Sequence, residues 1–208
     1  MVSEQEAGAG REGTGAMLGA AQVHPDWWPL AFAGAGADGT LLQWLADAPR
    51  SKARLFGCLL ERRNVPLRPV EATSTLGRML ALDEGRFERL LCRFGLVWNR
   101  ALLAREIDRR VLQGVIERVG EKAFRRTLSQ PVPSGRTLLL GESGGIDPDN
   151  LLQDGNLCLQ LWMAGQPRRE VAQLGLRLSP QAPSTNSVSA EDTDRARAIV
   201  QFEVHADD

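Results

Sequence analysis

Most of this chain carries apolar residues at the spacing of an amphipathic α-helix. The clearest example is 83–98, in which apolar side chains recur after three or four positions and therefore share one face of a helix. These positions are Phe87, Leu90, Leu91, Phe94 and Val97 or Trp98. Arg86, Arg89 and Arg93 stand between them. The pattern predicts a helix with one face in the core and an arginine-bearing face in solvent.

Similar patterns predict further helices before and after this segment. They cover 38–48, 51–64, 73–85, 99–119, 121–130, 150–165 and 167–178. Ser51 is the expected N-cap of its helix, and Asn64 is the expected C-cap after a cationic last turn. Proline at 49 ends the helix before it, because the residue preceding a proline disfavours helical geometry.

The pattern does not decide the secondary structure of three segments. The apolar stripe of 99–119 includes Ile107 and closes at Gly120, while Asp108 either breaks this helix or begins a new one. Residues 194–204 fit a helix or a strand equally well, and 136–140 is the candidate for a single strand.

These elements predict a mainly α protein with one globular helical domain. A fully buried apolar side chain contributes about 1.5–3 kcal/mol, which offsets chain entropy only when several helices share one core. We expect about seven to nine helices and at most a minor strand element in the C-terminal part. Residues 1–22, rich in Gly and Ala, are expected to form a disordered tail, with the helical domain at 23–178. Residues 179–208 are expected to be a mobile Ser/Pro-rich segment with a short terminal helix or strand.

Composition and the N-terminal sequence indicate the cellular compartment of the protein. The N-terminal sequence lacks the basic start and apolar stretch of a secretory signal, and no apolar run approaches the about 18–20 residues of a membrane span. The three cysteines, Cys58, Cys92 and Cys158, are odd in number and far apart, which argues against a disulfide framework. We therefore expect a cytoplasmic protein that is not exported and not inserted in a membrane.

The net charge of −1 conceals an uneven distribution. Residues 50–126 carry 18 basic against nine acidic residues, a net +9, whereas 1–49 and 127–208 each carry −5. Such a middle suits nucleic acid, an acidic protein partner, or the protein's own acidic ends. Its arginines are spread between apolar positions and alternate with glutamates, so an Arg-rich nucleic-acid-binding protein remains an alternative while a protein partner is favoured. Arg62, Arg63, Arg109 and Arg110 are the candidate residues of a basic docking face.

A catalytic alternative comes from "GESGG", residues 141–145, which matches the G-x-S-x-G turn around the nucleophile of a serine hydrolase. Ser143 would be that nucleophile, with His205 or His24 as its base. However, Asp147 and Pro148 interrupt the helix that this turn requires, so a flexible loop is favoured and we expect no enzyme. The "GAGADG" at 34–39 lacks a preceding strand, which favours a linker over a nucleotide loop.

Metal and cofactor sites are not expected, because two histidines and three isolated cysteines do not make a recognisable ligand set. Trp27 and Trp28 stand between two prolines where the chain becomes apolar. The favoured interpretation is that they pin the N-terminal segment onto the helical core, since each ring buries a large area at low entropy cost. The alternative is that they are exposed anchors for a partner.

Several fragments resemble the SctK family (YscK/PscK type) of bacterial type III secretion systems. "HPDWWP" at 24–29 resembles that family's "His-Pro-x-Trp-Leu-Pro". Residues 86–130 are similar to its central helical region, in which an "F-x-x-L-L-x-x-x-G-L" run leads to an Ile-Asp step and a Gly-Glu turn. "DGNLCLQLWMAGQP" at 154–167 and "LGLRLSP" at 174–180 are similar to its "D-G-x-x-C-L" helix and its ending. Together these fragments cover about half of the chain.

The resemblance implies a non-enzymatic adaptor of the sorting platform of a type III secretion injectisome. Such an adaptor links the cytosolic domain of the SctD-type inner-membrane ring protein to the SctQ-type pod protein. It implies a cytoplasmic protein held peripherally at the inner membrane through the secretion apparatus, with no cofactor and no nucleic acid. Because the family has no catalytic motif, no site residue is carried over.

Overall fold

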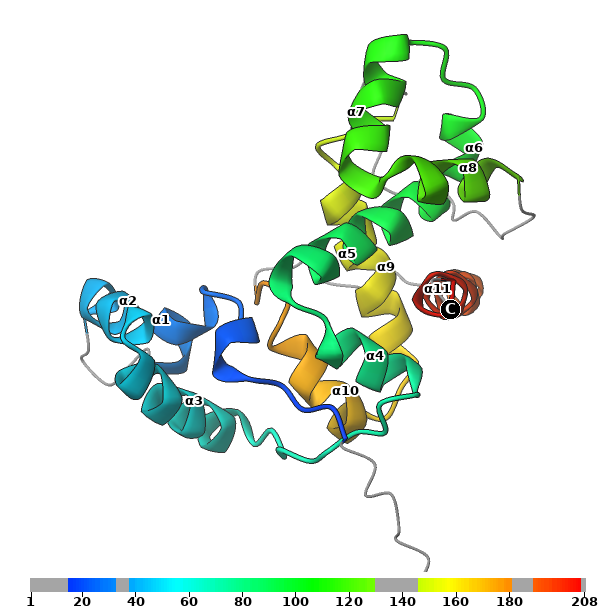
Figure 1. Cartoon of the computed structure of the whole chain (residues 1–208). Helices are drawn as coiled ribbons and strands as arrows, with labels where there is room; N and C mark the ends of the chain where they lie inside the picture. The colour runs from blue at the N-terminus through cyan, green and yellow to red at the C-terminus, as the bar shows by residue number, and fades with distance from the viewer. Residues whose placement is uncertain (1–14, 33–37, 130–145, 181–188, 207–208) are drawn as a thin grey trace, which may run out of the picture.

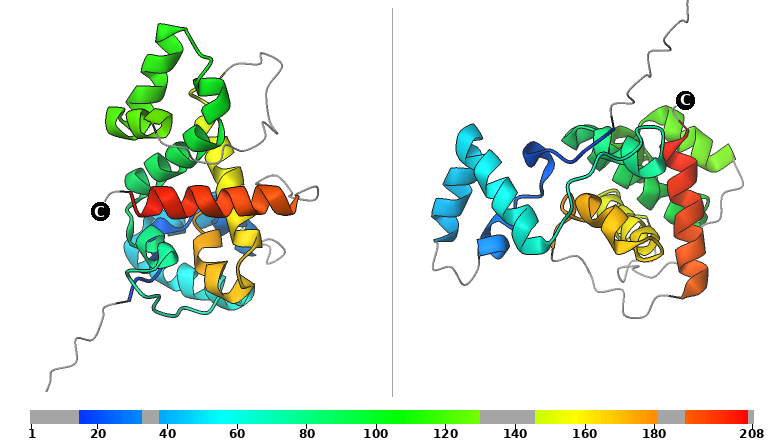
Figure 2. Two further views of the ribbon diagram at one scale, coloured as in Figure 1. Left: turned by 90° about the vertical axis from the view of Figure 1, so that its right-hand side faces the viewer. Right: turned by 90° about the horizontal axis from the view of Figure 1, so that it is seen from below.

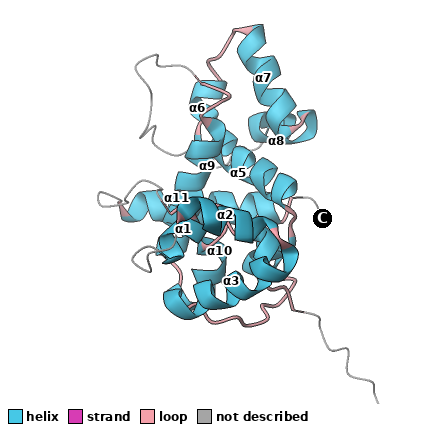
Figure 3. Ribbon diagram, turned by 90° about the vertical axis from the view of Figure 1, so that its left-hand side faces the viewer, coloured by secondary structure: helices cyan, strands magenta, loops and turns pink. Residues whose placement is uncertain are grey.

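The computed structural model describes residues 15–32, 38–129, 146–180 and 189–206. Within these ranges the chain forms eleven α-helices, one 3₁₀ turn and no strand (Figure 1, Figure 3). The predicted mainly α fold is confirmed. The helices outnumber the seven to nine that we expected, because Trp27–Phe32 forms a helix of its own and 99–119 divides into two. The strand candidate at 136–140 lies outside the described residues.

Two helices, α5 (Glu84–Trp98) and α9 (Leu151–Ala164), form the centre of the fold and pack along each other closely. The close approach depends on two glycines. A Cβ on Gly155 would lie 1.8 Å from the carbonyl oxygen of Leu91, and one on Gly95 would lie 2.1 Å from that of Leu151. No other residue fits at either position, since both neighbours are backbone atoms. The spacing predicted both helices, and Asp83 caps the first by accepting a hydrogen bond from the N–H of Arg86 (2.8 Å).

Three further helices cover this pair. They are α4 (Thr75–Ala81), α10 (Arg168–Gly175) and α11 (Ala190–Val204), and α11 lies across both central helices (Figure 2). Ala196, Ile199 and Val200 of α11 are fully buried. The domain boundary that we expected at 178 is therefore wrong. Residues 190–204 are helical and belong to the core, because their apolar positions complete a surface that only the folded α5 and α9 provide.

A smaller group of helices packs at the C-terminal end of α5. It consists of α6 (Arg100–Leu103), α7 (Arg109–Val119) and α8 (Glu121–Ser129), which enclose a second cluster with Leu96, Val115 and Val119 at its centre. Asp108 begins a new helix here, since its carboxylate accepts a hydrogen bond from the N–H of Arg110 (2.8 Å). Ile107 consequently leaves the apolar stripe and is 90% exposed in the connecting loop, contrary to the sequence pattern.

The N-terminal helices form a third group, with α1 (Trp27–Phe32), α2 (Gly39–Asp47) and α3 (Pro49–Arg63) in mutual contact. Asn64 caps α3 in the left-handed conformation (φ 50°), as predicted. Ser51 does not cap it, because α3 begins at Pro49, whose fixed φ suits a first helical position.

The expectation of a disordered tail over 1–22 is wrong for residues 15–22, and residues 1–14 lie outside the described ranges. Residue Leu18 is 2% exposed, and its N–H donates to the side-chain carbonyl of Gln173 (3.0 Å). Ala16 pairs with Val70 through two backbone hydrogen bonds, and the 3₁₀ turn η1 spans Ala20–Gln22. Residues 15–22 therefore belong to the folded domain. Local patterns did not predict this, because the contacts of Ala16 with Val70 and of Leu18 with Gln173 join positions that are distant along the chain.

Candidate functional site

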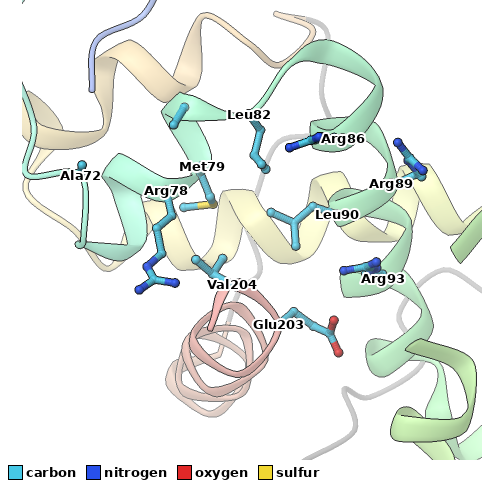
Figure 4. A pocket seen from close by; sticks show the side chains of 11 residues that line it. Ala72, Arg78, Met79, Leu82, Arg86, Arg89, Leu90, Arg93, Glu203 and Val204 are labelled. Carbon is cyan, nitrogen blue, oxygen red and sulfur yellow. The ribbon is translucent and has the colours of Figure 1, made fainter. Parts of the chain in front are cut away.

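A groove of about 500 Å³ opens between α4, the first half of α5 and the C-terminal end of α11 (Figure 4). Its lining combines apolar and basic side chains. The apolar part consists of Ala72, Met79, Ala81, Leu82, Leu90 and Val204. The charged part consists of Arg78, Arg86, Arg89, Arg93 and Glu203. Four guanidinium groups thus surround one apolar floor, with a single carboxylate among them.

The regular turn of α5 gathers three of these arginines on one face. Each residue advances the helix by about 100°, so Arg86, Arg89 and Arg93 stand within about 60° of one another. The glutamates of the same helix, Glu84 and Glu88, fall on the opposite side by the same reckoning. The helix therefore presents an arginine face to the groove, and Asp83 at the start of the helix pairs with Arg86 on this face.

Local backbone contacts hold two of the arginines beside the groove. The Nε of Arg89 donates to the carbonyl of Gly85 one turn earlier (3.3 Å), and the Nε of Arg78 donates to that of Thr73 (3.1 Å). Arg86 lies 3.3 Å from the carboxylate of Asp83, and both side chains are largely exposed. An exposed pair of this kind contributes little stability and leaves the guanidinium available for further hydrogen bonds.

The corner between α4 and α5, which forms the floor, is braced by two side chains from distant parts of the chain. The amide of Gln22 donates to the carbonyls of Leu80 (2.8 Å) and Leu82 (2.9 Å). Both acceptors lie at the end of α4, where a helix leaves its carbonyls without partners. The amide therefore caps this end of the helix from outside it.

Arg177 completes this support. Its guanidinium donates to the carbonyls of Met79 (2.8 Å) and Asp83 (3.3 Å) and lies 3.9 Å from the centre of the Phe87 ring. Burial lowers the pKa of Arg177 to about 10. Even so, it stays protonated at neutral pH and joins α4 to α5 as a cation.

At the other wall of the groove, Glu203 of α11 is engaged with a cation outside the groove. Its side chain is fully buried and accepts a hydrogen bond from the guanidinium of Arg126 on α8, which is 12% exposed. Arg126 also stacks over the ring of Phe202, 5.6 Å from its centre. A carboxylate of the described lining is therefore paired with Arg126, a residue outside that lining.

This arrangement is suited to binding anions. Arginine presents several N–H donors in a planar fork that matches a carboxylate. Among the described residues, the lining consists of Ala, Arg, Met, Leu, Glu and Val, and none of these is a serine, cysteine or histidine. Arginines beside an apolar floor suit a carboxylate-bearing ligand.

The four arginines predicted as one basic face are not brought together. Arg62 and Arg63 lie at the end of α3, whereas Arg109 and Arg110 begin α7, at the opposite end of the molecule (Figure 1). Arg62 and Arg63 also stack over the rings of Phe32 (5.2 Å) and Trp27 (4.8 Å). The prediction of one basic face is wrong, because α3 and α7 both carry arginines but lie far apart in the folded chain.

Trp28 is 2% exposed, and the indole N–H of Trp27 donates to the carbonyl of Leu178 (2.9 Å). The interpretation that these rings pin the N-terminal segment to the core is confirmed, and Trp28 is not available to a partner in this conformation. A different tryptophan is exposed: Trp44 on α2 is 66% exposed, with Leu41 one turn before it at 50%. Both side chains stand on the side of α2 away from its buried residues Leu42 and Ala46, although their spacing in the sequence fits an apolar stripe.

The remaining candidates do not assemble. Ser143 lies outside the described residues, and of the "GAGADG" stretch Asp38 caps α2 through the N–H of Thr40 (3.0 Å). His205 is exposed beside the hydroxyl of Thr75 (3.2 Å), and Nδ1 of His24 accepts from the N–H of Asp26 (3.3 Å). In the described part of the chain, no three His, Cys, Asp or Glu side chains are grouped so that they could hold a metal ion.

No helix within the described ranges combines the length and the apolar character needed to cross a membrane. No family model, no curated protein and no solved structure matches this chain. The function must therefore be argued from the geometry of the surfaces and from the resemblance of its sequence fragments.

Proposed function

We propose that this protein is a non-enzymatic adaptor of the sorting platform of a type III secretion system. It links the cytosolic domain of the SctD-type inner-membrane ring protein to the SctQ-type pod protein, and it works in the cytoplasm at the inner face of that membrane. The identity of the partners comes from the fragments that resemble the SctK family. An adaptor of this kind needs two separate binding surfaces.

The observation that supports the proposal is that two unlike surfaces lie on separate parts of the molecule. One is the basic groove of α4, α5 and α11. The other is on α2, where Leu41 and Trp44 are exposed, and Leu30 of the adjacent helix α1 is 43% exposed. Figure 1 shows α2 on the far side of the N-terminal helices from α5 and α11. Two partners can therefore be held without competing for one surface.

Exposed tryptophan is a frequent anchor of protein interfaces, because its ring buries a large area at low entropy cost. The groove, by contrast, favours a partner with complementary charge, which mainly sets the rate and orientation of encounter. One surface thus suits a partner bound through burial of apolar area, and the other suits a partner bound through complementary charge.

The test is a co-purification of the tagged full-length chain with the ring protein's cytosolic domain and with the pod protein. Trp44→Ala is expected to lower capture of one partner, and Arg86→Gln with Arg89→Gln is expected to lower capture of the other. All three side chains are exposed, so each change should alter stability by no more than about 0.5 kcal/mol. Circular dichroism checks that the helices remain.

A further variant, Arg109→Glu with Arg110→Glu, tests the sequence-based expectation that the start of α7 also contacts a partner. If neither partner co-purifies with the unsubstituted chain, the sorting-platform role is refuted. If one substituted surface removes both partners while the helices stay intact, the two-surface adaptor is refuted.

A further inference from the structure

We propose that two copies of this chain associate end to end, with a turn of one copy docked on an apolar helix face of the next. The turn is residues 104–108 between α6 and α7, here called the Ile107 turn, and the face is formed by Leu41 and Trp44 of α2. Ile107 (90%), Trp44 (66%) and Leu41 (50%) are the three most exposed large apolar side chains of the described residues. End-to-end association goes beyond the proposed adaptor role and is independent of it, because it needs only this chain.

The backbone of the Ile107 turn is held in place on both sides of the isoleucine. The N–H groups of Ile107 and Asp108 both donate to Oε1 of Glu106 (2.9 Å each). The carboxylate of Asp108 then accepts from the N–H of Arg110 and so caps α7 (2.8 Å). A loop that is ordered before binding loses less conformational entropy at an interface, so the turn is suited to present Ile107 to a partner.

Three arginines accompany Ile107 at this end of the molecule, namely Arg105, Arg109 and Arg110. All three are exposed, and none of their guanidinium groups forms an ion pair or a hydrogen bond with another described residue. With the carboxylates of Glu106 and Asp108, which face backbone N–H groups, residues 104–110 carry a net charge of +1. The turn therefore combines an apolar side chain with arginines that are available for contacts outside the chain.

The face of α2 carries the opposite charge at its borders. Leu41 and Trp44 are three residues apart and are both exposed. Asp38 lies three residues before the first and Asp47 three residues after the second, and both aspartates are exposed. Among the described residues, the first lysine or arginine along the chain is Arg50, at the start of α3. An apolar face bordered by carboxylates therefore stands at this end.

The two ends match in chemistry. An isoleucine between arginines suits an apolar face between aspartates, and a guanidinium group can also stack over the exposed ring of Trp44. Figure 1 shows α2 at the left and the connection between α6 and α7 at the upper right, so one copy cannot make this contact with itself. The contact therefore joins two copies and leaves each pair with one unused turn and one unused face. Such a heterologous contact extends into a row or closes into a ring.

The experiment measures the mass distribution of the full-length chain by sedimentation velocity. A contact made by a few exposed side chains belongs to the small, transient interfaces below about 1,200 Å². We therefore expect a Kd of about 0.1 mM, seen as an average mass that rises between about 10 µM and about 1 mM protein. Association should weaken between about 0.15 M and about 1 M salt, where the screening length falls from about 8 to about 3 Å.

Two substitutions and one matched control locate the contact. Ile107→Asp alters the turn and Trp44→Asp alters the α2 face, and each should raise Kd at least about tenfold. Leu67→Asp changes a 44% exposed leucine between α3 and α4, away from both ends, and should leave Kd unchanged. Arg109→Glu with Arg110→Glu should raise Kd about tenfold through charge alone. Circular dichroism checks that each variant keeps its helices.

A mixture of Ile107→Asp and Trp44→Asp tests the end-to-end geometry directly. Each variant retains the end that the other has lost, so each alone should be monomeric. Together they should form a 1:1 dimer that grows no further, because its remaining turn and face are both altered. A symmetric contact gives a different result, since one of the two variants would then associate by itself.

End-to-end association is overturned if the unsubstituted chain stays monomeric at about 1 mM, roughly tenfold above the expected Kd. It is also overturned if the mixed variants form no dimer, or if Leu67→Asp weakens association as much as they do. Association that persists in Ile107→Asp but not in Trp44→Asp would instead show a symmetric contact between two α2 helices. These results are separate from capture of the ring and pod proteins: a monomeric chain that captures both keeps the adaptor role, and a self-associating chain that captures neither loses it.

Discussion

The contact between α5 and α9 predicts a large effect from a single added methyl group. Gly155 lies where α9 crosses α5, and a Cβ at this position would be 1.8 Å from the carbonyl oxygen and 2.5 Å from the carbonyl carbon of Leu91. An ordinary contact of this kind is at least 3.4 Å, so Gly155→Ala requires the two backbones to separate by about 1.6 Å. No side-chain rotation can relieve the clash, because both atoms belong to a helix backbone.

Separating α5 and α9 disrupts their packing and so lowers the free energy of unfolding. Adding methylene groups to a packed core usually costs about 1–3 kcal/mol, and a clash between two backbones belongs at the upper end, about 3 kcal/mol. Alanine recovers about 1 kcal/mol because it is a better helix former than glycine. We therefore expect Gly155→Ala to lower the free energy of unfolding by about 2 kcal/mol, and Tm by about 4–8 °C for a chain of this size.

The assay is urea and thermal unfolding followed by circular dichroism. The matched control is Gly57→Ala on α3, where the added methyl group meets no atom within 4 Å. This control should gain about 0.5–1 kcal/mol from helix propensity alone. If Gly155→Ala melts at or above the temperature of the unsubstituted protein, the close approach of the two helices is not what stabilises the core.

Three further predictions concern buried polar groups. Arg126→Met should cost about 3–5 kcal/mol, because it removes a cation that pairs with a fully buried carboxylate of α11, and replacing both partners with apolar residues should recover most of that loss in urea unfolding. Burial raises the pKa of Asp154, so the folded protein holds the carboxyl proton more tightly than the unfolded chain does. The stabilisation from this protonated carboxyl is complete below about pH 3.8 and is lost as pH rises through the raised pKa. Asp154→Asn should therefore remove this part of the pH dependence of the free energy of unfolding, measured in a pH series of unfolding curves. Cys58 is exposed, whereas Cys92 and Cys158 are buried and burial raises the pKa of both thiols. A thiol reagent at neutral pH should therefore modify Cys58 rapidly, and Cys92 and Cys158 only after denaturation. Rapid modification of all three cysteines in the native protein would contradict the buried positions.

Only part of the groove could be predicted from the sequence. Arg86, Arg89 and Arg93 were recognised as one face of a helix, because helical spacing is a local property. Their convergence with Arg78 and with the end of α11 was not predicted, since it depends on how three helices from separate parts of the chain pack. The basic face inferred from Arg62 and Arg109 failed for the same reason.

The sequence by itself determined the helices and many of their ends. Backbone hydrogen bonds of a helix join residues four apart, and caps such as Asp83 and Asn64 act on the turn beside them, so the information is contained in short windows. Only the tertiary structure decided which helices meet. It packed residues 15–22 against the folded domain with Leu18 buried, exposed Ile107 and paired Arg126 with Glu203, 77 residues apart. These outcomes depend on partners that become neighbours only when the whole chain has folded, and no local pattern specifies them.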